Sequence, residues 1–328
     1  MKVLVSTIPF ADHDQGPLEA LKKNGAEVVL NPFGRKLREN DLTQIISDFD
    51  VLIAGTEPIS QVVLENASQL KLIARVGIGL DNVDLMSARR HGIEVSYTPE
   101  APSPAVAELT IGLMIDLLRL VQMSNVGIHR GEWHRYFGRR LTEVTIGIIG
   151  AGRIGGRVIR HLAGFNCKRI LVNDINQSIA LPSHPYCSVE RVDKESIYRE
   201  ADLISLHVPL NHQTRNLITK KVMSQMRPDS IIINTARGGI VNEKDLFDTL
   251  QSGKLAGAAI DVFEDEPYYG NLASLDQCLL TAHMGSMSVD CRTCMEREAV
   301  EEVVRFICGQ PRQLLVPEEE YTNQQMVR

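Results

Sequence analysis

The chain has 328 residues, 44% of them hydrophobic and 23% charged, with a formal net charge of −6. These values are ordinary for a globular protein of two domains, and the acidic balance argues against nucleic acid or an anionic membrane as a partner. Residues 1–10 form a strand pattern without a signal-peptide layout, and the most apolar helix pattern, residues 109–121, is too short to span a bilayer. The six scattered cysteines favour a reducing compartment, so we expect a cytoplasmic location.

The first hundred residues alternate between strand and helix patterns. Helical patterns lie between the strand patterns, at residues 16–24, 41–47, 61–67 and 85–91. The strand patterns themselves occupy residues 2–6, 27–30, 51–54, 72–76 and 94–97. This alternation predicts βαβ units and a doubly wound α/β domain with a parallel sheet.

A glycine-spaced loop, Arg75 to Asn82, follows the fourth of these strands. Such a loop can leave backbone N–H groups free to bind a carboxylate, and Arg75 would lie beside them. An ordinary turn between a strand and a helix explains the pattern equally well.

A proline-rich stretch, Thr98 to Pro104, predicts a domain boundary. The next helix is expected from Glu108 to Arg119, before a basic segment at residues 131–140 with interleaved aromatic residues. We expect these aromatic residues to be packing anchors, because nothing else in the sequence indicates nucleic acid. The helix would carry one apolar stripe, formed by Leu109, Leu113, Leu117 and Leu120.

The clearest motif is a dinucleotide-binding fingerprint at residues 144–155, VTIGIIGAGRIG. An apolar strand leads directly into Gly150, Gly152 and Gly155, and a helical pattern follows. In such a motif the first glycine permits a tight turn, the second lets a pyrophosphate approach and the third lets the helix pack closely. Asp174 ends the next strand, where a carboxylate that binds the ribose is expected.

The rest of the chain completes a second sheet, with strand patterns at residues 203–207, 230–234, 256–260 and 279–282. A helix is expected between Asn242 as N-cap and Gly253 as C-cap.

Residues 289–307 predict a helix that returns to the first domain. We attribute the spacing of Cys291 and Cys294 to this helix rather than to a metal or redox site. The polar tail, residues 318–328, is expected to fray.

Ionisable groups follow the last three of these strands, at the edge where open α/β sheets bind ligands. They are Arg237, then Asp261 with Glu266, then His283. An arginine can bind a carboxylate through its planar fork and polarise a keto oxygen. A histidine paired with a glutamate is stabilised in its protonated form and can protonate a developing alkoxide. The set predicts hydride transfer between a nicotinamide cofactor and a 2-keto acid.

Taken together, the motifs resemble those of the D-isomer-specific 2-hydroxyacid dehydrogenases, most closely the short phosphoglycerate-dehydrogenase-like members. The resemblance runs from about residue 51 to residue 306. It is carried by the motifs Arg75-x-Gly-x-Gly-x-Asp-Asn-x-Asp84, Ala107-Glu108-Leu-Thr, Gly150-x-Gly-Arg-Ile-Gly155, His207-Val-Pro-Leu, Asn234-Thr-Ala-Arg-Gly-Gly239, Asp261-Val-Phe-x-x-Glu-Pro267 and His283-x-Gly-Ser286.

The resemblance implies two doubly wound parallel-sheet domains. A Rossmann NAD-binding domain, residues 101–284, would be inserted into a flavodoxin-like substrate domain, residues 1–100 and 285–328. It also implies a homodimer without nucleic-acid or membrane partners.

The resemblance further implies the roles of individual residues. Arg237 would bind the substrate, Glu266 would hold His283, and His283 would act as acid and base, with Asp261 at the nicotinamide carboxamide. Arg75, Val76, Gly77, Ile78 and Gly79 would bind the substrate carboxylate together with Arg237, and no metal is implied. NAD would be contacted by Gly150, Gly152, Arg153, Ile154, Gly155, Asp174, Val208, Pro209, Thr235, Ala236, Asp261, His283 and Gly285.

The identity of the 2-hydroxy acid stays open. The substrate pair could include 3-phosphoglycerate, or the chain could be a hydroxypyruvate/glyoxylate or D-lactate-type reductase. Glu57 lies where phosphoglycerate-specific relatives can carry an arginine, and its charge would repel a phosphate, whereas Arg75 favours a second anion.

Two further alternatives remain. The chain could instead belong to another functional class, as an NAD(H)-sensing, corepressor-like binding protein, although the presence of Arg237, Glu266 and His283 favours an enzyme. The basic segment often lies at the dimer interface in this family, so its arginines either reach the partner's active site, or face solvent or pair with acids. These arginines are Arg135, Arg139 and Arg140.

Overall fold

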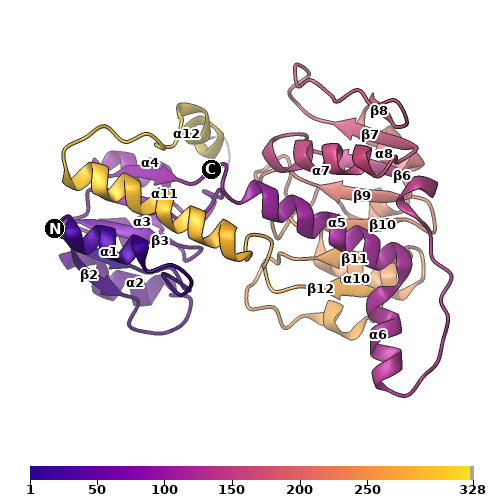
Figure 1. Cartoon of the computed structure of the whole chain (residues 1–328), viewed down its shortest axis with the longest axis horizontal. Coiled ribbons are helices and arrows are strands. Elements are labelled where there is room, and N and C mark those ends of the chain that lie inside the picture. The colour runs from indigo at the N-terminus through magenta and orange to yellow at the C-terminus, as the bar shows by residue number, and fades with distance from the viewer. Residues whose placement is uncertain (326–328) are drawn as a thin grey trace. The chain divides into compact units, whose positions relative to one another are not determined.

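The computed structural model describes residues 1–325 and divides the chain into two compact units (Figure 1). Unit 1 contains residues 1–102 and the chain from Met287 onward, and unit 2 contains Ser103–Ser286. The chain leaves unit 1 and returns to it, so unit 2 is an insertion. The expected boundaries, after residues 100 and 284, fall close to the observed ones.

Unit 1 is built on a parallel sheet with the strand order β2-β1-β3-β4-β5. Every residue of the central strands β3 and β4 is buried, because both faces of the sheet are covered. This order and pairing confirm the expected doubly wound domain. The strands are β1 (Lys2–Val5), β2 (Glu27–Leu30), β3 (Val51–Ala54), β4 (Leu72–Arg75) and β5 (Glu94–Tyr97).

Short helices connect these strands, and one long helix joins them from the end of the chain. Asp84 caps α4 by accepting a hydrogen bond from the amide of Ser87 at 2.8 Å. The long helix α11 (Val289–Ile307) has the predicted bounds and packs against α1 and β4, so it returns to unit 1 as expected. The connecting helices are α1 (Gly16–Lys23), α2 (Glu39–Ile45), α3 (Gln61–Glu65) and α4 (Leu85–Arg90).

The prediction of a frayed tail is wrong for residues 318–325, which form helix α12 (Glu318–Gln325) against α4. Tyr321 is buried, and the Arg89 guanidinium lies 3.7 Å from its ring centroid. The Gln324 side chain accepts from the amide of Leu85 and donates to a backbone carbonyl, both at 2.8 Å. Tertiary contacts therefore order a segment whose own sequence has no apolar stripe; residues 326–328 lie outside the described part.

Replacing Tyr321 with Ala should destabilise unit 1, because it removes a buried ring and leaves a cavity beneath Arg89. We expect the free energy of unfolding to fall by about 3 kcal/mol. Thermal unfolding measures the change, with Thr322→Ala on the exposed side of α12 as the matched control. Equal stability of the two variants would mean that α12 contributes nothing to the fold.

Unit 2 contains a larger parallel sheet with the order β12-β11-β10-β9-β6-β7-β8. The order reverses at β6, which lies between β9 and β7, and ligands bind at such a reversal in doubly wound sheets. Strand β8 is polar and only half-buried, which is why hydrophobic patterning missed it. The strands are β6 (Thr145–Ile149), β7 (Arg169–Asn173), β8 (Ser188–Arg191), β9 (Leu203–Leu206), β10 (Ile231–Asn234), β11 (Gly257–Ile260) and β12 (Cys278–Leu280).

The helices of unit 2 correct two predictions. Helix α5 begins at Ser103, so Pro104 lies in its first turn, where a missing N–H costs nothing, rather than in a break. Leu120 adopts a left-handed conformation after the end of the helix, so the predicted leucine stripe is wrong for this residue, whereas Leu109, Leu113 and Leu117 pack in the core of unit 2. The helices are α5 (Ser103–Arg119), α6 (Val121–His129), α7 (Arg153–Gly164), α8 (Lys194–Glu200), α9 (Lys220–Met223) and α10 (Glu243–Gln251); the buried face of α5 is formed by Val106, Ala107, Thr110, Ile111, Leu113, Met114 and Leu118.

The basic segment that follows α6 has no regular structure, and two of its aromatic residues, Trp133 and Phe137, are not packing anchors, whereas Tyr136 is half-buried. Trp133 is 85% exposed and Phe137 is fully exposed. Arg139 is not free to reach a substrate, because it pairs with Asp202 at 3.2 Å and with Asp229 at 3.4 Å.

Candidate active site

The predicted chemical groups of unit 2 lie on the loops that leave the carboxyl ends of its strands. Because the strands are parallel, these loops share one edge of the sheet. The glycine-rich loop follows β6, Asp174 follows β7 and His207 follows β9. The loop from Thr235 to Arg237 follows β10, Asp261 follows β11 and the loop with His283 follows β12, while Val208 and Pro209 continue the chain after His207.

The glycine-rich loop is closed against the sheet and open on its other side. A Cβ at Gly150, where φ is +94°, would lie 2.4 Å from the carbonyl oxygen of His207. A Cβ at Gly155 would lie 1.9 Å from the carbonyl oxygen of Gly150, so only glycine lets α7 pack this closely. Nothing lies within 4 Å of a Cβ at Gly152, the N-cap of α7. This open cradle at a helix N-terminus fits the pyrophosphate of NAD.

Asp174 is tied to this loop. One carboxylate oxygen accepts a hydrogen bond from the amide of Ala151 at 2.6 Å, and the other accepts from the amide of Asn176 at 2.7 Å. These bonds fix the carboxylate beside the cradle, where the ribose would lie, and each oxygen keeps a lone pair for a hydroxyl.

His207 lies against the glycine-rich loop. Its Nε2 lies 2.9 Å from the Ser205 hydroxyl, and its Nδ1 is buried without a hydrogen-bond partner in residues 1–325. Burial lowers the pKa of His207 to about 3, so the imidazole is neutral near pH 7. Sequence motifs singled out this histidine without indicating its structural role.

His283 and Glu266 form the pair expected from the sequence. The Nδ1 atom of His283 lies 2.9 Å and 3.0 Å from the two carboxylate oxygens of Glu266. Since a carboxylate accepts, Nδ1–H donates, and Nε2 remains to carry the exchangeable proton. One Glu266 oxygen also accepts from the amide of Phe263 at 3.2 Å, which orients the carboxylate.

The buried carboxylate of Asp261 holds the loop that carries His283. It accepts hydrogen bonds from the Thr281 hydroxyl at 2.6 Å and from the amides of Met284 and Gly285 at 2.9 Å. The backbone carbonyl of Asp261 accepts from the amide of His283 at 2.8 Å. His283 itself has φ +49°, so these bonds hold a backbone conformation that is uncommon for a residue other than glycine.

Arg237 lies in a turn organised by Asn234. The Asn234 side chain donates to the carbonyl of Arg237 at 2.8 Å and accepts from the amide of Ala236 at 3.1 Å. The Arg237 guanidinium donates to the carbonyl of Ala236 at 2.7 Å. The Thr235 hydroxyl lies 2.9 Å from that of Thr110 on α5, a contact that no sequence pattern predicted.

In the loop of unit 1 that was expected to bind a carboxylate, only some of the backbone N–H groups are available. The amide of Val76 donates to the carbonyl of Ala54 at 2.8 Å, and the amide of Gly77 donates to the Thr98 hydroxyl at 2.7 Å. The expectation of free N–H groups is therefore wrong for these two residues. The amides of Ile78 and Gly79 have no hydrogen bond within residues 1–325.

Arg75 is buried at the start of the same loop, and its guanidinium donates to the carbonyl of Val76 at 2.7 Å. A Cβ at Gly77, where φ is +133°, would lie 1.6 Å from the Arg75 Nη1 atom. The glycine is required because the guanidinium lies against the loop.

The two closely spaced cysteines belong to α11, as predicted. Burial raises the pKa of the Cys291 thiol to about 12, which keeps it protonated and unreactive. Across residues 1–325 there is no cluster of three or more His, Cys, Asp or Glu side chains placed to hold a metal ion, and no helix there is long and apolar enough to span a bilayer.

Comparison with known proteins identifies the family. Residues 111–285 match the model of the D-isomer specific 2-hydroxyacid dehydrogenase NAD binding domain. The chain belongs to the D-isomer-specific 2-hydroxyacid dehydrogenase family. It is accordingly an NAD-dependent oxidoreductase that transfers a hydride between nicotinamide and a D-2-hydroxy acid/2-keto acid pair, and its resemblance to this family is confirmed.

Individual relatives align with most of this chain. A hydroxypyruvate reductase from Thermotoga maritima is 35% identical over 299 residues, which are 88% of this chain and 96% of the relative. A D-3-phosphoglycerate dehydrogenase from Methanocaldococcus jannaschii is 37% identical over 282 residues, which are 84% of this chain but 53% of the relative. The TT0316 protein from Thermus thermophilus has a solved structure with a TM-score of 0.86 at 31% identity, covering 97% of this chain and 100% of the other.

Replacing His207 with Gln should make the dehydrogenase more resistant to acid. The folded state binds the His207 proton only near pH 3, whereas the unfolded state binds it near pH 6.5. As the pH is lowered between these two values, the free energy of unfolding of the wild type therefore decreases, and this group contributes at most about 1.4 kcal/mol per pH unit. Urea unfolding at about pH 7 and pH 5 measures the difference, with the exposed His212→Gln as control. Parallel losses in all three proteins would exclude His207 as a source of acid lability.

Proposed function

We propose that the dehydrogenase reduces a small 2-keto acid with a single negative charge, such as hydroxypyruvate or glyoxylate. The observation that carries the proposal is the His283–Glu266 pair, which lies at the same sheet edge as the glycine-rich loop and Arg237. A histidine held at Nδ1 by a carboxylate is suited to donate a proton from Nε2.

In this proposal three side chains carry the reaction. When bound, NADH would supply the hydride for the keto carbon. Arg237 binds the substrate carboxylate and polarises the keto oxygen through its charged fork. Protonated His283 transfers its Nε2 proton to the developing alkoxide, and Glu266 stabilises the imidazolium before the transfer. In the oxidative direction, neutral His283 removes the hydroxyl proton.

The remaining expected contacts become part of the same proposal. The free amides of Ile78 and Gly79 bind the substrate carboxylate, next to Arg75, Val76 and Gly77. Asp174 binds the ribose, and Asp261 contacts the nicotinamide carboxamide. The cofactor-binding set is Gly150, Gly152, Arg153, Ile154, Gly155, Asp174, Val208, Pro209, Thr235, Ala236, Asp261, His283 and Gly285.

Glu57 supports a substrate without a phosphate. The residue is 2% exposed, and its carboxylate accepts hydrogen bonds from the Ser6 hydroxyl and from the amide of Gly55 at 3.0 Å. It is a buried structural acid rather than a group presented to substrate. Its negative charge at the carboxyl end of β3 nevertheless disfavours a second anion there. The Thermotoga hydroxypyruvate reductase, which the chain matches over nearly its whole length, is consistent with this preference.

We also propose a cytoplasmic homodimer. The exposed Trp133 and Phe137 lie on the segment after α6, and a second copy of this chain would cover them.

A substrate panel with purified protein tests the proposed function. We expect NADH oxidation with hydroxypyruvate or glyoxylate, at a kcat/KM at least about tenfold higher than with phosphohydroxypyruvate, because a second anion would be repelled without a matching cation. Pyruvate tests the D-lactate-type alternative. A preference for phosphohydroxypyruvate would contradict the proposed substrate, and binding of NADH without oxidation by any keto acid would favour a sensing protein.

Replacing Glu266 with Gln should lower kcat/KM for keto-acid reduction by about tenfold or more. The neutral side chain would lose the charge-assisted hydrogen bond that holds His283 Nδ1–H, at 2.9 Å in the wild type, and would no longer orient the imidazole for proton transfer. Steady-state kinetics measures the change. The neighbouring Glu264→Gln is the control, since its carboxylate faces Arg215 at 3.8 Å. Unchanged kcat/KM in Glu266→Gln would exclude Glu266 as the functional partner of His283.

A further inference from the structure

A buried ion pair lies near the start of α11, outside the groups considered so far. Arg292 and Glu296 are one turn apart, with side chains only 10% and 4% exposed, and the Arg292 Nε atom lies 2.7 Å from a Glu296 oxygen. Removing two charges from water is costly unless hydrogen bonds satisfy their remaining donors and acceptors. The partners of the pair therefore indicate what it holds in place.

Those partners belong to the loop between β1 and α1. Arg292 Nη2 donates to the Thr7 hydroxyl at 2.9 Å and to the carbonyl of Pro9, and the second Glu296 oxygen accepts from the amide of Ala11 at 2.9 Å. Ala11 has φ +60°, a conformation that is uncommon for alanine. The ion pair thus holds residues 7–11 at the carboxyl end of β1.

The contacts continue from this loop to the next one. Thr7 packs against Gly55 so closely that a Cβ there would lie 2.7 Å from the Thr7 hydroxyl oxygen. The same Cβ would lie 3.0 Å from a carboxylate oxygen of Glu57, which also accepts from the amide of Gly55. The loop after β3 is therefore fixed between Thr7 and its own buried acid.

The third loop in the series is the one proposed to bind the substrate carboxylate. The Asn82 side chain, at the end of that loop, donates to the carbonyl of Gly55 at 3.1 Å and to the carbonyl of Glu57 at 2.7 Å. Arg292 is thereby connected, through Thr7 and Gly55, to the loop that carries the free amides of Ile78 and Gly79.

We propose that Arg292 is a positioning residue for substrate binding, which acts by fixing the loops after β1, β3 and β4 through Thr7. This inference rests on the proposed function of the loop from Arg75 to Asn82. The buried pair lies on α11, a helix that follows His283 closely in the chain. In this proposal the pair controls the position of the backbone that binds the substrate carboxylate.

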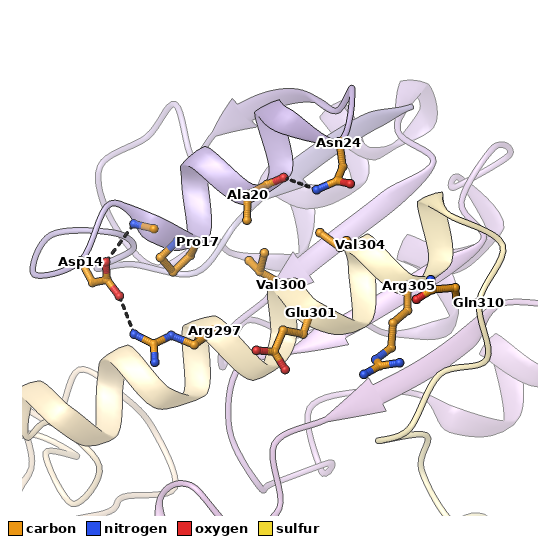
Figure 2. Close-up of a pocket in the computed structure, with 11 residues that line it drawn as sticks. Asp14, Pro17, Ala20, Asn24, Arg297, Val300, Glu301, Val304, Arg305 and Gln310 are labelled. Atoms are coloured by element: carbon orange, nitrogen blue, oxygen red, sulfur yellow. Dashed lines mark hydrogen bonds and ion pairs between the residues drawn. The ribbon is translucent and has the colours of Figure 1, made fainter.

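The chain contains a matched control for this pair. Arg297 lies on the same helix and binds Asp14, which precedes α1, at 3.0 Å. Figure 2 shows this pair at one end of an open groove between α1 and α11, whose apolar residues include Pro17, Val300 and Val304. Arg297 joins the same two segments, but its side chain is 62% exposed and does not contact Thr7. An exposed pair of this kind contributes little to stability.

Steady-state kinetics with the best keto acid of the panel tests the proposal in four variants: Thr7→Val, Arg292→Met, Arg292→Lys and Arg297→Ala. For Thr7→Val and Arg292→Met we expect KM for the keto acid to rise about tenfold or more, with kcat changed far less, because carboxylate binding loses its preformed loop. The Kd of NADH, measured by fluorescence, should stay within about twofold, since the glycine-rich loop belongs to unit 2. Arg292→Lys should fall between wild type and Arg292→Met, and Arg297→Ala should match wild type.

Thr7→Val keeps the test decisive if Arg292→Met fails to fold, because it breaks the connection without leaving a buried charge unpaired. Unchanged KM in folded Thr7→Val, or equal changes in keto-acid KM and NADH Kd, would overturn the proposal. Amide hydrogen exchange gives a readout that does not depend on activity: exchange in residues 7–11 and 54–58 should accelerate in Thr7→Val but not in Arg297→Ala. If wild type reduces no keto acid, the proposed function fails, while unchanged exchange in Thr7→Val overturns the inference alone.

Discussion

The parallel direction of the strands is the constraint on which the candidate site depends. Every strand in both sheets runs parallel to its neighbours, so the loops that leave their carboxyl ends lie along one edge of each sheet. Residues far apart in the sequence, such as Gly150, Arg237 and His283, share the edge of unit 2 for this reason. The edge of unit 1 likewise brings together the loops after β1, β3 and β4.

Buried carboxylates then fix these loops. Asp261 holds the segment around His283, Glu57 holds the loop after β3, and Glu296 holds the loop after β1. Each accepts hydrogen bonds from backbone amides that would otherwise be buried without a partner, and this satisfies both the charge and the amide. Asp261 and Glu57 accept from neutral hydroxyl and amide donors, whereas Glu296 also pairs with Arg292 and Glu266 pairs with His283.

Family membership and local geometry answer different questions about this protein. The family establishes NAD-dependent chemistry on a D-2-hydroxy acid/2-keto acid pair. The geometry adds that the Nε2 proton of His283 is the one left for exchange, and that only part of the loop from Arg75 to Asn82 offers free amides. Glu57 lies near this loop, but its carboxylate oxygens are bound by the Ser6 hydroxyl and the Gly55 amide, so it holds the backbone rather than contacting the substrate.

The sequence by itself determined the alternation of strands and helices, the glycine-rich loop and the candidate groups at the strand ends. These features depend on local periodicity and on glycine spacing, which are set by residues that are close together in the sequence. Only the tertiary structure decided the rest. Helix α12 forms because Tyr321 and Gln324 find partners on and before α4, β8 pairs although its sequence is polar, and Trp133 stays exposed in a segment expected to pack. Arg292 and Thr7 meet across most of the chain's length, and no local pattern can encode such a contact, because its free energy comes from groups that only the fold brings together.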